Sequence, residues 1–96
     1  MGSKSNPGKF DCWAKAEPDE PMFVLLGRDP AAWVVVNFWV ALRRELGEGG
    51  EKLAEAVDCA RAMQRWASEH GKDVHAAAGA YERLLKKQGE ILESSS

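Results

Sequence analysis

The chain has 96 residues, of which 45% are apolar and 29% are charged, and its formal net charge is −2. A chain of this length forms one domain at most, with a small core. Its 13 basic and 15 acidic side chains include no long run of one sign. The charge pattern therefore argues against binding to duplex DNA or to an anionic membrane surface.

Both ends of the chain are rich in small polar residues. Residues 1–9 (MGSKSNPGK) lack the apolar stretch of a signal peptide, so we expect a flexible lead on a cytoplasmic protein. Residues 94–96 (SSS) are expected to form a frayed tail, which leaves residues 10–93 as the single folded domain. Cys12 and Cys59 form no CxxC unit. We expect two free thiols, with one disulfide between them as the alternative.

The segment from residue 10 to residue 27 precedes the first predicted helix. Residues 10–21 (FDCWAKAEPDEP) are polar, with Phe10 and Trp13 as aromatic anchors and two prolines that oppose a helix. Residues 22–26 (MFVLL) form a short apolar run of strand type that ends at Gly27. We expect this run to lie extended across the helices and to bury its apolar side chains against them.

The first helix is predicted over residues 31–46. Asp29 can accept hydrogen bonds at the helix start, and Pro30 suits the first helical position. The glycines of GEGG, residues 47–50, end the helix and read as a hinge. Three consecutive valines at 34–36 are typical of a strand, but the length of the segment and its start and stop signals favour a helix.

Two more helices follow, over residues 51–70 and 73–93. In the first of these, a stripe suited to a close helix neighbour comprises Leu53, Ala56, Ala60, Met63 and Ala67. In the second, a heptad-like seam comprises Val74, Ala78, Tyr81, Leu85, Gln88 and Leu92. The predicted fold is mainly α: a helical hairpin plus a third helix, with a short extended N-terminal segment.

The first helix is apolar on every side, since Asn37 is its only polar residue between positions 31 and 42. This run of about 12 residues is well short of the roughly 20 that a bilayer span needs. A helix that is apolar all round must be covered all round. We therefore predict a homo-oligomer or partner interface, formed by Trp33, Phe38, Trp39, Val40, Tyr81 and Leu85. The alternative is that the N-terminal segment covers this helix.

Side chains with catalytic or metal-binding potential are present but poorly spaced. Cys12, Cys59, His70 and His75 are suitable zinc ligands, yet neither cysteine has a near neighbour and a helix end separates the histidines. Cys59 and His70 are about 16 Å apart along one helix. Asp19 and Glu20 are typical of a solvated turn. We therefore expect no catalytic residue, no metal and no cofactor.

Arginines offer the best candidate for ligand binding. Arg28 lies just before the first helix, where backbone N–H groups favour an anion. The predicted pocket for an anionic ligand comprises Arg28, Trp33, Arg43 and Arg44. The alternative is that Arg28 forms an ion pair with Asp19, Glu20 or Asp29 and fixes the loop.

The segment from residue 10 to residue 66 resembles a family of small uncharacterised proteins of tailed phages and prophages. Its motif, DEPxFVLxxxDxxA, is matched by Asp19, Glu20, Pro21, Phe23, Val24, Leu25, Asp29 and Ala32, with Trp39 in the following helix. The chain departs from the family pattern in its apolar VVVN and FWV stretches and in its third helix. The family has no settled activity, so the resemblance implies no catalytic residue.

The resemblance implies a small accessory phage protein that acts by binding, in counter-defence or host takeover, within the host cytoplasm. Together with the residues above, it predicts a non-enzymatic oligomer that sequesters an anionic small ligand such as a nucleotide signal. One alternative is an inhibitor that contacts a host or defence protein directly. Another is a virion or assembly component.

Overall fold

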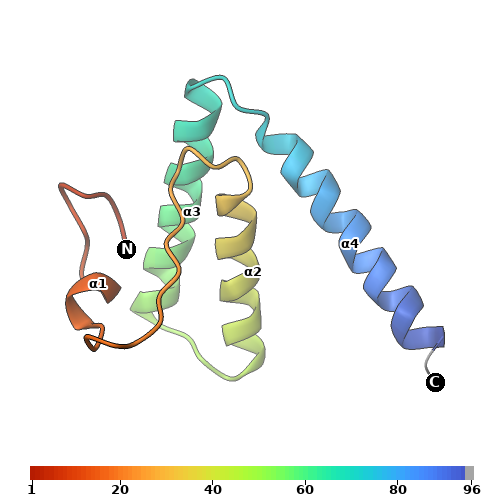
Figure 1. The fold of residues 1–96 in the computed structure, drawn as a ribbon, viewed down its shortest axis with the longest axis horizontal. Coiled ribbons are helices and arrows are strands. Elements are labelled where there is room, and N and C mark those ends of the chain that lie inside the picture. The colour runs from red at the N-terminus through yellow and green to blue at the C-terminus, as the bar shows by residue number, and fades with distance from the viewer. Residues whose placement is uncertain (95–96) are drawn as a thin grey trace.

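The computed structural model describes the backbone of residues 1–94 and the side chains of residues 1–87. The helices are α1 (Cys12–Lys15), α2 (Ala32–Glu45), α3 (Glu51–Glu69) and α4 (Val74–Ser94), and residues 1–94 contain no strand (Figure 1). The predicted mainly α class is therefore confirmed. The side chains of Gln88 and Leu92, which complete the predicted seam, lie outside the described residues.

Helices α2 and α3 form an antiparallel hairpin that contains the core (Figure 1). Val40 of α2 meets Leu53 and Ala56 of α3, and these side chains are at most 2% exposed. Ala60 and Ala67 continue the buried face of α3. Because alanine side chains are short, the two helices can approach closely. Leu53 and Ala56 of the predicted stripe on α3 thus pack on α2.

Glycines in the left-handed conformation end both long helices of the hairpin. Gly47 has φ +89° and Gly71 has φ +78°. After α2, the amide of Gly47 donates to the carbonyl oxygen of Arg44, and the amide of the next residue donates to the carbonyl oxygen of Arg43, both at 3.0 Å. After α3, the amide of Gly71 donates to the carbonyl oxygen of Ser68 at 3.1 Å, and the amide of the next residue donates to the carbonyl oxygen of Ala67 at 2.9 Å. Both ends are Schellman motifs, which non-glycine residues adopt only with strain.

Aspartates organise the starts of α2 and α4. The Oδ1 atom of Asp29 accepts from the amide of Ala31 at 2.9 Å, and the Asp29 carbonyl accepts from Ala32 at 3.1 Å. The regular helix therefore begins at Ala32, one residue later than predicted. Asp73 Oδ1 accepts from the amides of residues 75 and 76 at 3.1 and 3.0 Å. This carboxylate caps α4.

The N-terminal part of the chain contains a short helix that the sequence analysis did not predict. Asp11 caps α1 by accepting from the amide of Trp13 at 3.1 Å. Both prolines of this segment lie after α1 and so do not oppose it. Lys9 pairs with Glu51 at 2.6 Å, and the amide of Phe10 donates to Glu55 at 3.4 Å. These contacts attach the lead to the first turns of α3.

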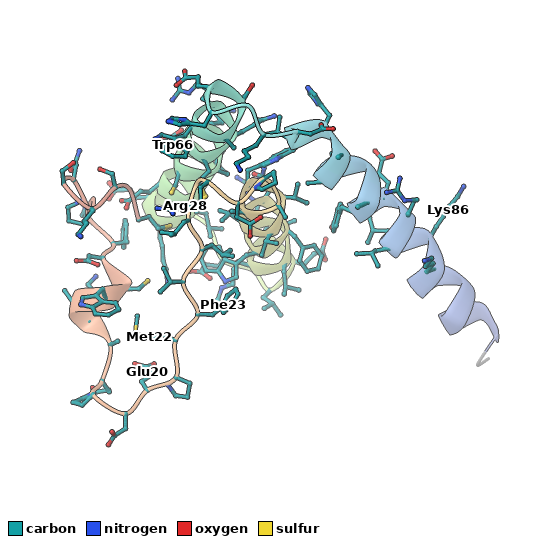
Figure 2. All side chains as sticks on the ribbon, turned by 45° about the horizontal axis from the view of Figure 1, so that its top comes forward. Glu20, Met22, Phe23, Arg28, Trp66 and Lys86 are labelled. Carbon is teal, nitrogen blue, oxygen red and sulfur yellow. The ribbon has the colours of Figure 1, made fainter. Side chains whose placement is uncertain are left out.

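The expectation that residues 22–26 bury their side chains is wrong. Phe23 is 86% exposed and Val24 is 60% exposed, and only Leu25 is half-buried. The segment passes over the hairpin as an irregular extended strip (Figures 1 and 2). It finds no groove to fill, because Trp39 and other neighbours of the core already close the space between α2 and α3.

Helix α4 diverges from the hairpin after its first turns (Figure 1). Val74 is buried at its start, and Tyr81 makes an edge-to-face contact with Phe38 at 5.7 Å between ring centroids. Further along, Leu84 and Leu85 are 57% and 46% exposed. The radius of gyration is accordingly 15.3 Å, against about 12.5 Å for a compact domain of this length. No helix within residues 1–94 combines the length and apolar character of a membrane span.

Candidate functional site

Arg28 lines a cavity of about 510 Å³ between three parts of the chain. The N-terminal loop, the segment just before α2 and one side of α3 form its walls; Figure 2 labels Arg28 and Trp66. The lining residues are Gly2, Ser3, Lys4, Asn6, Leu25, Leu26, Gly27, Arg28, Cys59, Ala62, Met63 and Trp66. A volume of this size suits a small organic ligand.

Two cationic side chains, those of Arg28 and Lys4, belong to this cavity. Among the side chains of residues 1–87, neither forms an ion pair with a carboxylate. The alternative in which Arg28 pairs with an acidic neighbour is therefore not realised in the described structure. Glu20 instead accepts from the amide of Glu17 at 3.0 Å, and Asp29 accepts at the start of α2. The cavity thus has two positive charges available for an external anion.

The predicted role of the α2 N-terminus does not hold in the structure. The carboxylate of Asp29 accepts a hydrogen bond from the amide of Ala31, and its carbonyl accepts one from the amide of Ala32. The amides of Ala31 and Ala32 are thus already bonded, and the Asp29 carboxylate repels a second anion at this place. An anionic ligand of Arg28 would therefore lie on the α3 side of the segment, in the cavity.

The cavity also has an apolar wall with one large aromatic side chain. Leu26, Ala62 and Met63 contribute aliphatic surface, and Trp66 is 45% exposed. His70 stacks on Trp66, with 3.6 Å between ring centroids and 13° between planes. The Nδ1 atom of His70 lies 2.7 Å from the carbonyl oxygen of Trp66, within hydrogen-bonding distance. The contact with the carbonyl orients the imidazole, which covers one face of the indole.

The other residues of the predicted pocket lie elsewhere. Trp33 lines a separate cavity between α2 and α4. Arg43 pairs with Glu48 and lies over Trp39, 6.0 Å from the ring centroid. Arg44 is exposed near the far end of α2, about 18 Å along the helix from its start. Of the four predicted residues, only Arg28 therefore belongs to this cavity.

Sequence reasoning did not identify Lys4 and Trp66 as partners of Arg28. Lys4 falls in the expected flexible lead, and Trp66 lies outside the predicted stripe of its helix. Sequence patterns describe neighbours along the chain, whereas the cavity depends on how the lead folds back towards α3.

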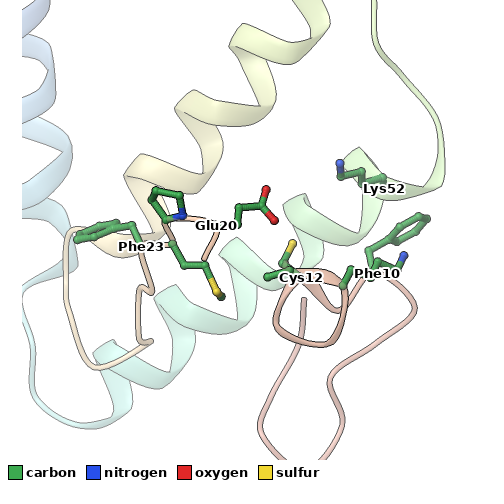
Figure 3. Close-up of a pocket in the computed structure, with 9 residues that line it drawn as sticks. Phe10, Cys12, Glu20, Phe23 and Lys52 are labelled. Atoms are coloured by element: carbon green, nitrogen blue, oxygen red, sulfur yellow. The ribbon is translucent and has the colours of Figure 1, made fainter. Parts of the chain in front are cut away.

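A second cavity, of about 440 Å³, lies between α1, the following segment and the first turn of α3 (Figure 3). Lys15 and Lys52 line it, together with Cys12, Glu20 and Phe23. The ammonium group of Lys15 already lies 5.4 Å from the ring centroid of Phe10. Because the cavity combines a carboxylate with its lysines, it is less selective for an anion than the Arg28 cavity.

The four side chains that could in principle bind zinc do not come together in the structure. Cys12 and Cys59 are both free and line different cavities. His70 stacks on Trp66, and His75 lies in the first turn of α4. Within the part of the chain that the structure describes, no group of three His, Cys, Asp or Glu side chains could hold a metal ion. Asp19 is exposed, as is typical of a solvated turn.

The residues of the predicted interface occupy different environments. Val40 is 2% exposed and belongs to the core, so its assignment to an interface is wrong. The reason is that Val40 lies on the side of α2 that faces α3. Trp33, Trp39 and Tyr81 are half-buried, whereas Phe38 and Leu85 are 45% and 46% exposed. Only the latter two offer large apolar surface to another chain.

No family model, curated protein or solved structure matches this chain.

Proposed function

We propose that this chain is a non-enzymatic binding protein that holds an anionic small ligand with a flat ring, such as a nucleotide, in the Arg28 cavity. The proposal rests on one observation: two cationic side chains, those of Arg28 and Lys4, line the same cavity as an apolar wall. Neither cation has a carboxylate partner among the described side chains. Unpaired cations beside an apolar surface suit a ligand that has a charged end and an apolar end.

The two ends of such a ligand would be recognised by different chemistry. The guanidinium of Arg28 can donate two parallel hydrogen bonds to a phosphate, and Lys4 adds a mobile point charge. Met63 and Trp66 contribute apolar surface to the same lining. A base could stack or pack there, and such contacts are tolerant of base identity. The arrangement favours nucleotides over inorganic anions, which would leave the apolar wall unused.

The resemblance to small phage proteins gives this activity a setting. A phage or prophage protein that captures a nucleotide signal in the host cytoplasm would deprive a defence pathway of its messenger. Self-association belongs to the same proposal, because α2 has apolar side chains that neither α3 nor α4 covers. The phage setting and the self-association extend the proposal beyond the cavity, and each is testable separately from ligand binding.

A second candidate function is direct contact with a host or defence protein. It is favoured by the apolar side chains exposed on the N-terminal part of the chain. Trp13 is 75% exposed, Phe23 is 86% exposed and Val24 is 60% exposed. Exposed aromatic residues of this kind are typical anchors in protein–protein interfaces.

Calorimetric titration with a panel of nucleotides and inorganic phosphate tests the first candidate. Arg28→Ala should remove a charge-assisted contact worth about 1.5–3 kcal/mol, which weakens binding by roughly 10- to 100-fold. Arg44→Ala is the matched control, because Arg44 is an exposed arginine that lines none of the three described cavities. Trp66→Ala should weaken nucleotide binding while leaving the weaker binding of phosphate unchanged.

Two results would contradict the ligand proposal. One is that the wild-type chain binds no member of the panel. The other is that Arg28→Ala and Arg44→Ala weaken binding equally, which would indicate a general charge effect. In either case, loss of a captured protein on replacing Trp13 or Phe23 by alanine would support the second candidate.

A further inference from the structure

The first ten residues form a closed loop. At its tip, the amide of Ser3 donates to the carbonyl oxygen of Asn6 at 2.9 Å, and the amide of Asn6 donates back to the carbonyl oxygen of Ser3 at 3.2 Å. At its base, the amino group of Met1 donates to the carbonyl oxygens of Pro7 and Phe10 at 2.9 and 2.6 Å. Hydrogen bonds therefore fasten the loop to itself at both its tip and its base.

Glu55, in the second turn of α3, holds the base of this loop. Its Oε1 atom lies 3.4 Å from the amino group of Met1 and accepts from the amide of Phe10, also at 3.4 Å. The two partners of this ion pair are only 18% and 23% exposed, so water screens it less than the pair of Lys9 and Glu51, which are 71% and 74% exposed. We call the contacts of Glu55 with Met1 and Phe10 the Glu55 latch.

Gly8 allows the loop to come this close to α3. A methyl group at this position would collide with the carbonyl oxygen of Met1 and with the carboxylate of Glu55. Gly8 also has φ +80°, a conformation that other residues adopt only with strain. The chain therefore has a glycine at the point where its backbone passes over the Glu55 latch.

The Glu55 latch determines where Lys4 lies. Lys4 belongs to the turn at the tip of the loop, which lines the Arg28 cavity, whereas Glu55 does not line it. Cys59 does line the cavity, one helical turn after Glu55 on the same face of α3. Within the described structure, residues 2–6 form hydrogen bonds only inside the loop. The base of the loop therefore places its tip over this face of α3.

We propose that Glu55 is a positioning residue for the anionic ligand, because it fastens the N-terminal loop to α3 and so keeps Lys4 at the cavity that Arg28 lines. The inference rests on the proposed nucleotide binding, to which it adds how the second cation is positioned. In this arrangement an acidic residue promotes the binding of an anion. Charge repulsion alone predicts the opposite, since removal of a carboxylate makes a chain more attractive to anions.

Calorimetric titration with AMP, ADP and ATP tests the sign of this effect. Glu55→Gln should weaken binding by roughly 10-fold, close to the effect of Lys4→Ala, because both variants leave the phosphate with Arg28 as its cation. Glu51→Gln is the matched control. It removes the same charge from the same end of α3, but its partner Lys9 does not line the cavity. It should leave binding unchanged or slightly stronger.

A chain that combines Glu55→Gln with Lys4→Ala separates positioning from a general loss of structure. If Glu55 acts through Lys4, the double variant should bind about as weakly as Lys4→Ala alone, because both substitutions remove the same contact. Independent damage to the cavity would instead multiply the two losses. Neither side chain belongs to the hairpin core, so circular dichroism should report unchanged helix content. All variants are compared with Met1 retained, which intact mass spectrometry verifies.

The alkylation rate of Cys59 reports on the loop without any ligand. Cys12 is exposed and is replaced by serine in every variant, so that only Cys59 reacts. With iodoacetamide, a neutral reagent, Glu55→Gln and Gly8→Ala should each raise the rate by roughly 10-fold, because a released loop no longer covers the cavity. Gly8→Ala changes no charge, so its effect reports access to the thiol. Gly49→Ala, where a methyl group meets nothing within 4 Å, should leave the rate unchanged.

Three results would overturn the proposal. The first is an unchanged Cys59 rate in both Glu55→Gln and Gly8→Ala, which would show that the Glu55 latch does not hold the loop. The second is a Glu55→Gln variant that binds nucleotide at least as tightly as the wild type. The third is a double variant that binds far more weakly than Lys4→Ala alone. Absence of nucleotide binding by the wild-type chain would instead refute the proposed function, and the Cys59 rates would still decide whether Glu55 holds the loop.

Discussion

Replacing Leu53 by alanine tests whether the α2–α3 hairpin is the stabilising core. Leu53 is 1% exposed and is the largest fully buried side chain among the described residues. It packs in a cluster with Val40 and Ala56. Truncation of a buried leucine to alanine costs about 2.7–5.0 kcal/mol, and the cost rises with the cavity that remains.

The structure places the expected cost in the upper half of that range. The fully buried neighbour on α3 is Ala56, whose side chain is too short to move into the cavity. Both helices are anchored at the turn between them by the Schellman motif at Gly47. We therefore expect Leu53→Ala to lower the free energy of unfolding by about 4 kcal/mol. For a domain of this size, that loss lowers the melting temperature by roughly 15–30 °C.

Urea denaturation followed by circular dichroism measures this loss, at one fixed protein concentration because self-association adds to apparent stability. The matched control is Leu84→Ala, since Leu84 is 57% exposed on the diverging part of α4. Its effect should stay within about 0.5 kcal/mol. If Leu53→Ala costs less than about 1 kcal/mol, the hairpin interior is not the stabilising core and the reasoning is wrong.

Further predictions concern the ends of the helices, the later turns of α4, and Trp33 of α2. Gly71→Ala should cost about 1–2 kcal/mol by thermal melting, because Gly71 has φ +78°; Gly49→Ala, at a position without positive φ, should be neutral. Asp73→Ala should remove the α4 cap and cost about 1 kcal/mol of helix stability, measured by circular dichroism. Hydrogen exchange should be faster in residues 78–87 than in α3, because no side chain of residues 78–87 is fully buried, whereas α3 has four buried side chains. Trp33→Phe should leave the free energy of unfolding within about 1 kcal/mol of wild type, because the buried Nε1–H of Trp33 has no acceptor among the described residues.

The three long helices could be predicted from the sequence because each boundary has a local cause. Gly47 and Gly71 adopt positive φ and end their helices, and Asp29 organises the turn that starts α2. Local signals in the sequence did not predict α1, which is only four residues long. Its cap, Asp11, lies in a segment whose prolines favoured an irregular structure. Short helices of this kind depend on one carboxylate and produce no periodic pattern.

The segment 22–26 shows why burial was harder to predict than helices. Its apolar residues indicated a buried strand, but a strand needs a partner, and residues 1–94 contain none. Alternatively it could have filled a groove between helices. Trp39 and other side chains that pack on the core fill the space between α2 and α3. Whether Phe23 is buried therefore depends on the packing of two other elements, which no local pattern encodes.

The candidate site depended even more on tertiary structure. Arg28 was identified because it precedes a helix, yet its significance in the structure is the cavity against α3. Lys4 and Trp66 reach that cavity from positions far apart in the sequence. Arg43 was predicted to bind the ligand and instead pairs with Glu48 at the end of α2. Charges near a helix end commonly find local partners, so sequence proximity alone overestimates how many remain free for a ligand.

The apolar character of α2 has a geometric consequence for the whole chain. A helix that is apolar on every side needs neighbours on at least three sides, and this chain provides two: α3 along one side and the first turns of α4 along a flank. The divergence of α4 leaves the third side open and raises the radius of gyration to 15.3 Å. The Schellman motif at Gly71 sets the direction in which the chain leaves α3, so α4 starts on its diverging course directly at the end of α3 (Figure 1).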